Sequence, residues 1–174
     1  DVDGIANCDP LQISESDFMD AVSGSQILYA EDDSSSAHLM QALLSEEGHR
    51  IDVASSGKGF LESLEVFRPD LCLLDLNLPD VSGLDLLQTV KTTYPDLPVL
   101  MVTASDSIDD AVRAMKLGAV DFVTKPVDAR RLKISIKHVL DLSHQKQKIE
   151  HLQSDLNENY SLDHMVGSSA EMEN

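Results

Sequence analysis

The sequence predicts an α/β fold, a (βα)5 doubly wound parallel sheet that begins at Gln26. Short apolar runs recur along the chain, and each is followed by a segment whose apolar residues repeat with helical spacing. Strands separated by helices need crossover connections, which produce a parallel sheet with helices on both faces. With 42% hydrophobic and 4% aromatic residues, the core is expected to be aliphatic.

The first two strand–helix units are marked by their end signals. Residues 27–30 are an apolar strand, and a serine among residues 34–36 can cap the helix that follows, which Gly48 ends. Residues 51–54 are the second strand. The helix after it has an apolar face made of Phe60, Leu61, Leu64 and Phe67.

The third strand, residues 71–74, is apolar throughout, which is typical of a strand buried on both faces. A turn at residues 79–83 leads into a helix over residues 84–93. Residues 98–103 form the fourth strand, and the next helix, with Met115 expected in the core, is closed by Gly118. The fifth strand, residues 119–124, is broken by Pro126.

The two ends of the chain differ from this domain, which we place at residues 26–145. Residues 1–25 are acidic and are predicted to be a flexible extension, with a short helix near residues 17–22. From residue 128 to about Tyr160 there is no Pro or Gly, which predicts one long helix that passes into a helical linker over residues 146–166. Beyond Tyr160 the composition is that of a loop, and residues 167–174 are expected to begin another, truncated domain.

The linker contains an apolar heptad spacing. Leu142, Ile149 and Leu156 recur every seven residues, which favours a two-stranded coiled coil and therefore a homodimer. Gln145 and Gln153 fall in or beside the seam, so a solvated single helix is the alternative.

Bulk composition excludes several classes of function. The net charge of −18 argues against this chain alone binding nucleic acid or an anionic membrane. Two cysteines do not make a disulfide framework, and no apolar run approaches the ~18 residues of a membrane helix. A reducing cytoplasm is the expected location.

Five polar residues end four of the predicted strands. They are Glu31, Asp32, Asp75, Thr103 and Lys125. A lone Asp at a strand end often only caps a turn, but all carboxyl ends of a parallel sheet share one edge, so these residues should meet. Two like charges ~4 Å apart cost roughly 4 kcal/mol at an effective dielectric near 20, which a divalent cation would relieve.

Oxygen ligands with room for water and phosphate select Mg²⁺. Together with a hydroxyl and an ammonium, such a site indicates phosphoryl transfer. Asp75 would be the nucleophile, with Thr103 and Lys125 contacting the phosphoryl oxygens.

The motifs at these strand ends resemble those of a response-regulator receiver domain, which has a CheY-like, flavodoxin-like fold. In order they are Ile-Leu-Tyr-Ala-Glu-Asp-Asp (27–33), Leu-Leu-Asp-Leu-Asn-Leu-Pro-Asp-Val-Ser-Gly (73–83), Val-Thr-Ala (102–104) and Thr-Lys-Pro (124–126). The resemblance implies phosphorylation of Asp75 by a histidine kinase or histidine phosphotransfer protein.

The resemblance also assigns the remaining site residues. Glu31, Asp32, Asp75 and the backbone carbonyl of Asn77 would bind Mg²⁺, although the family more often has Asp where Glu31 stands. Thr103 would be the signalling hydroxyl, Phe122 the aromatic switch, and the Lys125–Pro126 peptide bond would be cis. The face made of the fourth helix, fifth strand and fifth helix would be a second possible dimer surface.

Residues 160–172, Tyr-Ser-Leu-Asp-His-Met-Val-Gly-Ser-Ser-Ala-Glu-Met, resemble the junction of an NtrC-like activator of sigma-54 RNA polymerase, in which an AAA+ ATPase domain follows the receiver. No phosphate-binding Gly-Lys-Ser/Thr loop is present. The chain is therefore expected to be a signalling domain that catalyses only its own phosphorylation and dephosphorylation, with ATPase activity and DNA binding belonging to a longer protein.

Two alternatives remain open from the sequence. A haloacid-dehalogenase-type hydrolase also forms an aspartyl phosphate, but its Asp-x-Asp-x-Thr pattern is broken here by Asn77 in place of the second Asp. A constitutive protein-binding pseudo-receiver is the other, and the intact Asp75, Thr103 and Lys125 count against it.

Overall fold

The computed structural model describes residues 24–172, so the predicted extension and the short helix near residues 17–22 lie outside the described residues. The strands are β1 (Gln26–Ala30), β2 (Arg50–Ala54), β3 (Leu71–Leu74), β4 (Val99–Thr103) and β5 (Asp121–Thr124). The helices are α2 (Ser34–Glu46), α3 (Gly57–Phe67), α4 (Gly83–Thr93), α5 (Ile108–Lys116) and α6 (Ala129–Met172). The predicted alternation of strands and helices is confirmed.

All neighbouring strands pair in parallel, in the order β2-β1-β3-β4-β5. The order reverses between β1 and β3, and such a switch point opens a crevice at the carboxyl ends of the two strands. Ala30 pairs with Leu74, so the residues that follow these two strands emerge side by side. Thr103 pairs with Thr124 in the same way at the end of β4 and β5.

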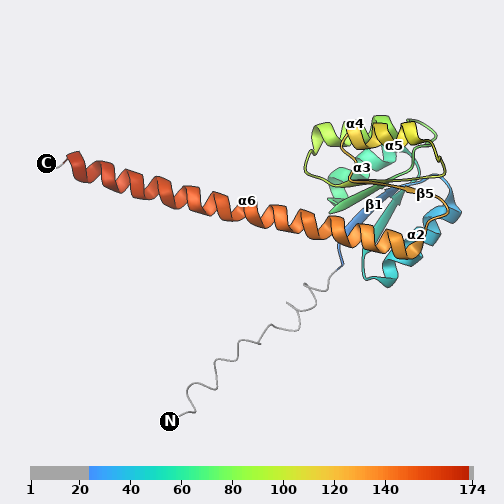
Figure 1. The fold of residues 1–174 in the computed structure, drawn as a ribbon, viewed down its shortest axis with the longest axis horizontal. Helices are drawn as coiled ribbons and strands as arrows, with labels where there is room; N and C mark the ends of the chain where they lie inside the picture. The colour runs from blue at the N-terminus through green and yellow to red at the C-terminus, as the bar shows by residue number, and fades with distance from the viewer. Residues whose placement is uncertain (1–23, 173–174) are drawn as a thin grey trace, which may run out of the picture. The chain divides into compact units, whose positions relative to one another are not determined.

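Both faces of the sheet are covered. In Figure 1, α3, α4 and α5 lie on one side of the sheet and α2 lies on the other. All four residues of β3 are buried, as expected for a central parallel strand with no solvated face. Leu28 and Ala30 join the core on the α3–α5 side, so Ile27 and Tyr29, which alternate with them, point to the opposite side.

Two expectations, one about a helix and one about a strand, are wrong. Met115 was expected in the core, but 49% of its surface is exposed, because the face of α5 that it shares with Ile108 and Val112 turns away from the sheet. The fifth strand begins at Asp121 instead of Ala119, because the Ala119 N–H still donates to the Ala114 carbonyl and closes α5.

Helix α6 is longer than predicted. The chain divides after Lys133, and the part of α6 from Ile134 onward forms a unit of its own. The helix continues to Met172, so the expectation of a loop beyond Tyr160 is wrong. The segment contains no Pro and one Gly, Gly167, and a single interior Gly costs a helix about 1 kcal/mol without ending it. The domain boundaries at 145, 146–166 and 167–174 stay predictions.

Candidate functional site

The carboxylates predicted to meet at the sheet edge do meet. The Asp75 N–H donates to the Ala30 carbonyl at 3.1 Å, so parallel pairing continues one step past β1 and β3 and sets Glu31 beside Asp75. Carboxylate oxygens of Glu31, Asp32 and Asp75 all lie within 4.8 Å of one another. Glu31 and Asp75 are buried and Asp32 is exposed, so the cluster opens to solvent on the Asp32 side.

Lys125 reaches this cluster from the end of β5. Its backbone N–H donates to the Thr103 carbonyl at 2.7 Å, and its Nζ donates to Asp75 Oδ2 at 2.8 Å and to Glu31 Oε2. Burial by itself would lower the pKa of the ammonium, but the hydrogen bonds to Asp75 and Glu31 raise it above its usual value. Lys125 is therefore charged at neutral pH, and the Lys125–Pro126 peptide bond behind it is cis.

Glu31 is held by groups that the sequence reasoning did not identify. The Tyr29 hydroxyl donates to Glu31 Oε2 at 2.6 Å, and the Asp33 N–H donates to Oε1 at 3.2 Å. Tyr29 is completely buried, and its burial together with the hydrogen bond to Glu31 raises the pKa of the phenol far above its usual value. The signal that could have found it is a Tyr two residues before the first acid, because residues i and i+2 of a strand share a face.

The loop after Asp75 is fixed by its own backbone hydrogen bonds and by contacts with the start of α3. The Asn77 N–H donates to Asp75 Oδ1 at 3.2 Å, and the Gly83 N–H donates to the Leu76 carbonyl at 2.8 Å. A Cβ on Gly83 would lie 2.1 Å from the Asp75 carbonyl oxygen, so only glycine fits there. Asp80 accepts from the N–H groups of Gly57 at 2.8 Å and Lys58 at 2.9 Å, which ties the loop to the start of α3.

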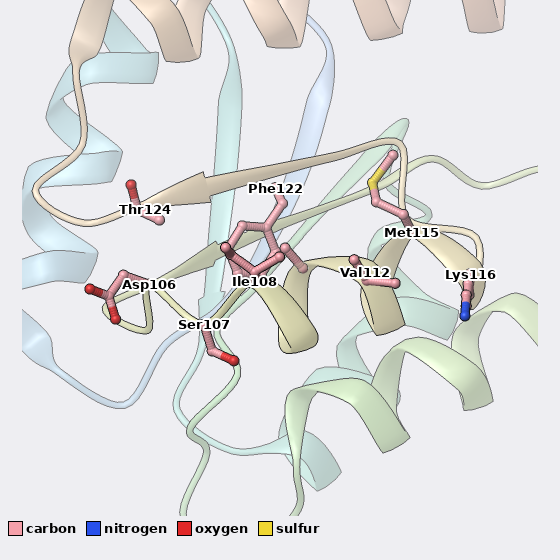
Figure 2. A pocket seen from close by; sticks show the side chains of 9 residues that line it. Asp106, Ser107, Ile108, Val112, Met115, Lys116, Phe122 and Thr124 are labelled. Carbon is pink, nitrogen blue, oxygen red and sulfur yellow. The ribbon is translucent and has the colours of Figure 1, made fainter.

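Thr103 and Phe122 lie on the strands β4 and β5. Thr103 is fully buried at the end of β4, and its Oγ1 accepts from the Ser105 N–H at 3.1 Å. Phe122, in β5, lines a pocket of about 570 Å³ together with Ile108, Val112 and Met115 of α5 (Figure 2). The structure thus brings Glu31, Asp32, Asp75 and Lys125 together, and places the two predicted switch residues on the adjoining strands.

The donor set of the cluster suits a hard cation. Its three carboxylates face the single charge of Lys125, so two negative charges are left uncompensated among these four side chains. Carboxylate oxygens this close together repel strongly at the reduced dielectric of a half-buried site. Glu31, Asp32 and Asp75 could therefore hold a metal ion, and oxygen-only ligands favour Mg²⁺, Ca²⁺ or Mn²⁺ over softer metals.

The sequence model of the response regulator receiver domain matches residues 27–137. The chain belongs to the response regulator receiver domain family. It is a receiver of the kind found in two-component systems, as its motifs implied, and the parallel five-stranded sheet is the CheY-like fold.

Several regulatory proteins resemble this receiver domain. It is 43% identical over 110 residues to the luminescence regulatory protein LuxO of Vibrio campbellii, covering 63% of this chain and 24% of that protein. It is 38% identical over 121 residues to the transcriptional regulatory protein ZraR of Klebsiella oxytoca, covering 68% of this chain and 27% of ZraR. The chain thus spans about a quarter of the length of these relatives.

Solved structures give the same result. The CheY-like receiver domain protein of Methanospirillum hungatei superposes with a TM-score of 0.68 at 30% identity, over 71% of this chain and 99% of that one. NtrX of Brucella abortus in complex with ADP superposes with a TM-score of 0.71 at 33% identity, over 74% of this chain and 30% of NtrX. Within residues 24–172, no helix is both long and apolar enough to cross a membrane.

Proposed function

We propose that this receiver accepts a phosphoryl group on Asp75 from the phosphohistidine of a histidine kinase or a histidine phosphotransfer protein. In this transfer an Asp75 carboxylate oxygen forms a bond to phosphorus while the bond from phosphorus to the histidine nitrogen breaks, and the imidazole nitrogen keeps the electron pair. The observation that carries the proposal is the convergence of Lys125 and two further carboxylates on a buried Asp75.

Glu31, Asp32, Asp75 and the backbone carbonyl of Asn77 would hold Mg²⁺, with Glu31 acting mainly through metal-bound water. When bound, Mg²⁺ neutralises charge on the phosphoryl oxygens during transfer. This assignment agrees with the oxygen-only donor set and with the uncompensated charge of the carboxylates.

The side chains around Asp75 would respond to the added charge. Phosphorylation places about −1.5 to −2 charge at this position. Lys125, which donates to Asp75 Oδ2, would transfer its hydrogen bonds to a phosphoryl oxygen, and Thr103 would turn its Oγ1 away from the Ser105 N–H to donate to another. Phe122 would then turn inward from its half-exposed position and reshape the α5–β5 face.

The output would be a change in self-association. Four apolar side chains along α6 are each at least 52% exposed, as expected of a helix whose apolar seam pairs with a second copy. They are Leu142, Ile149, Leu152 and Leu156. The alternative dimer surface is the α5–β5 face, where Ile108 is 79% exposed. We propose that the domain is cytoplasmic and that pairing controls an AAA+ ATPase and DNA-binding part of an NtrC-like sigma-54 activator. The relatives LuxO, ZraR and NtrX support this context.

The test is Mg²⁺-dependent binding of beryllofluoride, which mimics the aspartyl phosphate. Wild type should bind it, Asp75→Ala should not, and Asp109→Ala, which removes an exposed carboxylate from α5, should bind as wild type does. Binding that survives Asp75→Ala would show that the acceptor is misassigned. A wild-type chain that binds neither beryllofluoride nor acetyl phosphate would instead be a constitutive protein-binding pseudo-receiver.

A further inference from the structure

Tyr29 is the only tyrosine among the buried residues of the described part of the chain, and its hydroxyl is bonded to a carboxylate. It donates to Glu31 Oε2 at 2.6 Å, a distance typical of a hydrogen bond from a hydroxyl to an ionised carboxylate. A phenylalanine would fill the same volume beneath the sheet edge. The hydroxyl therefore acts on Glu31, not on the packing of the core.

Glu31 has three donors, and they differ in how firmly they are fixed. Tyr29 and Asp33 belong to β1 and the residues directly after it, so their positions relative to Glu31 are set by the local backbone. Lys125 comes from the end of β5, 94 positions along the chain, and shares its ammonium with Asp75. When Lys125 moves to a phosphoryl group, Tyr29 is the side-chain donor that stays with Glu31.

The length of Glu31 matches the position of the phenol. An aspartate has one carbon–carbon bond less, which would draw its carboxylate back by about 1.5 Å. That retreat would lengthen the 2.6 Å contact beyond hydrogen-bonding range and leave a fully buried hydroxyl without this acceptor. Tyr29 and Glu31 are therefore a matched pair, which gives a physical reason for a glutamate at a position where an aspartate would be the shorter ligand.

We propose that Tyr29 is a positioning residue of the metal site, whose hydroxyl fixes the Glu31 carboxylate toward the cation and so sets the affinity for Mg²⁺. The inference rests on the Mg²⁺ site of the proposed function. Without the hydroxyl, Glu31 Oε2 keeps only the bond from Lys125, whose ammonium is shared with Asp75, and the site loses a preorganised oxygen. Partners that orient a metal ligand typically contribute about tenfold or more to metal affinity.

A double-mutant cycle tests this proposal. Mg²⁺ dissociation constants are measured by titration calorimetry for wild type, Tyr29→Phe, Glu31→Asp and the double variant, with circular dichroism to verify folding. Tyr29→Phe should weaken Mg²⁺ binding about tenfold in the wild-type background. In the Glu31→Asp background, where the phenol no longer reaches the carboxylate, the same change should alter affinity by less than about twofold.

The matched control is Tyr94→Phe, which removes the hydroxyl of a tyrosine that is 38% exposed after α4 and should leave Mg²⁺ affinity unchanged. An unchanged affinity in Tyr29→Phe would overturn the proposal, and so would an equal loss in both backgrounds, since that would reflect general packing. A wild-type chain that binds no Mg²⁺ would overturn the proposed function itself, which distinguishes the two failures.

Discussion

Replacing Lys125 with methionine should destabilise the domain in the absence of metal and much less in its presence. Methionine keeps most of the side-chain volume but removes the ammonium that donates to Asp75 Oδ2 at 2.8 Å and to Glu31. The two carboxylates are 5% and 2% exposed, so they would be left close together with little solvent to screen them.

The magnitude follows from the burial of the three groups. Breaking a buried ion pair from one side costs about 3–5 kcal/mol. Because the Lys125 side chain is still 18% exposed and water can reach the site, we expect a loss near the lower end, about 3 kcal/mol. A cation that binds only the folded chain raises the free energy of unfolding by RT ln(1 + [Mg²⁺]/Kd), which is about 2.7 kcal/mol at a hundredfold excess over Kd.

The assay is urea unfolding followed by circular dichroism, in EDTA and in saturating MgCl2. The stabilisation by Mg²⁺ should be larger for Lys125→Met than for wild type, because the ammonium and the cation compete for the same carboxylates. The control is Lys133→Met, which breaks the partly exposed ion pair with Glu47 at 2.8 Å and should change stability little and equally in both buffers. Equal stabilisation of Lys125→Met and wild type by Mg²⁺ would refute the reasoning.

Three further predictions each concern one residue. Gly83→Ala drives a Cβ to 2.1 Å from the Asp75 carbonyl oxygen and should cost about 2 kcal/mol in urea unfolding. Gly59→Ala should cost clearly less, because the nearest neighbour of its Cβ is a side-chain atom, Ser56 Oγ, at 3.1 Å; equal losses would contradict the close approach at Gly83. Burial and the hydrogen bond to Glu31 raise the pKa of the Tyr29 phenol, so above pH ~10 only the unfolded chain loses this proton. The free energy of unfolding should therefore fall with rising pH more steeply for wild type than for Tyr29→Phe, by up to about 1.4 kcal/mol per pH unit. Parallel pH profiles of the two proteins would argue against this pKa shift. Ile149→Asp should lower the mass measured by sedimentation equilibrium, because it places a charge in the proposed apolar seam of α6. Gln147→Asp, about 200° away around the helix, should leave the mass unchanged. Identical masses for the two variants would show that α6 does not form the dimer contact.

The parts of the site that the sequence predicted share one property: each residue lies at or just after the carboxyl end of a strand. Parallel pairing fixes where a strand ends, so the ends of β1 and β3 place Glu31 and Asp75 without any knowledge of side-chain packing. Lys125 was predictable for the same reason, because β5 pairs with β4 up to Thr124. Chain order and strand register are sufficient here.

The parts that were missed depend on which way a side chain points. Tyr29 lies inside an apolar strand, where the sequence pattern predicts only a core residue. The 2.6 Å hydrogen bond to Glu31 shows that its hydroxyl contacts the site while its ring packs in the core. Met115 has the helical spacing of a core residue, but the apolar face it belongs to is turned outward at the α5–β5 pocket. Beyond Tyr160, a loop-like composition did not prevent a helix, since composition contributes only fractions of a kcal/mol per residue.

With Asp75 as the proposed phosphoacceptor, the charge balance of the site would let one lysine serve both states of the domain. Before phosphorylation, the ammonium of Lys125 is divided between Asp75 and Glu31, and neither carboxylate is fully compensated. The proposed phosphoryl group on Asp75 would add negative charge there, so the most favourable position of the ammonium would move toward it. Tyr29 and the Asp33 N–H, which donate to Glu31, would keep that carboxylate in place. The displacement of the Lys125 ammonium would then be driven by electrostatics. The Lys125 backbone N–H donates to the Thr103 carbonyl at 2.7 Å, so the ammonium can move on its side chain without a change in this backbone contact.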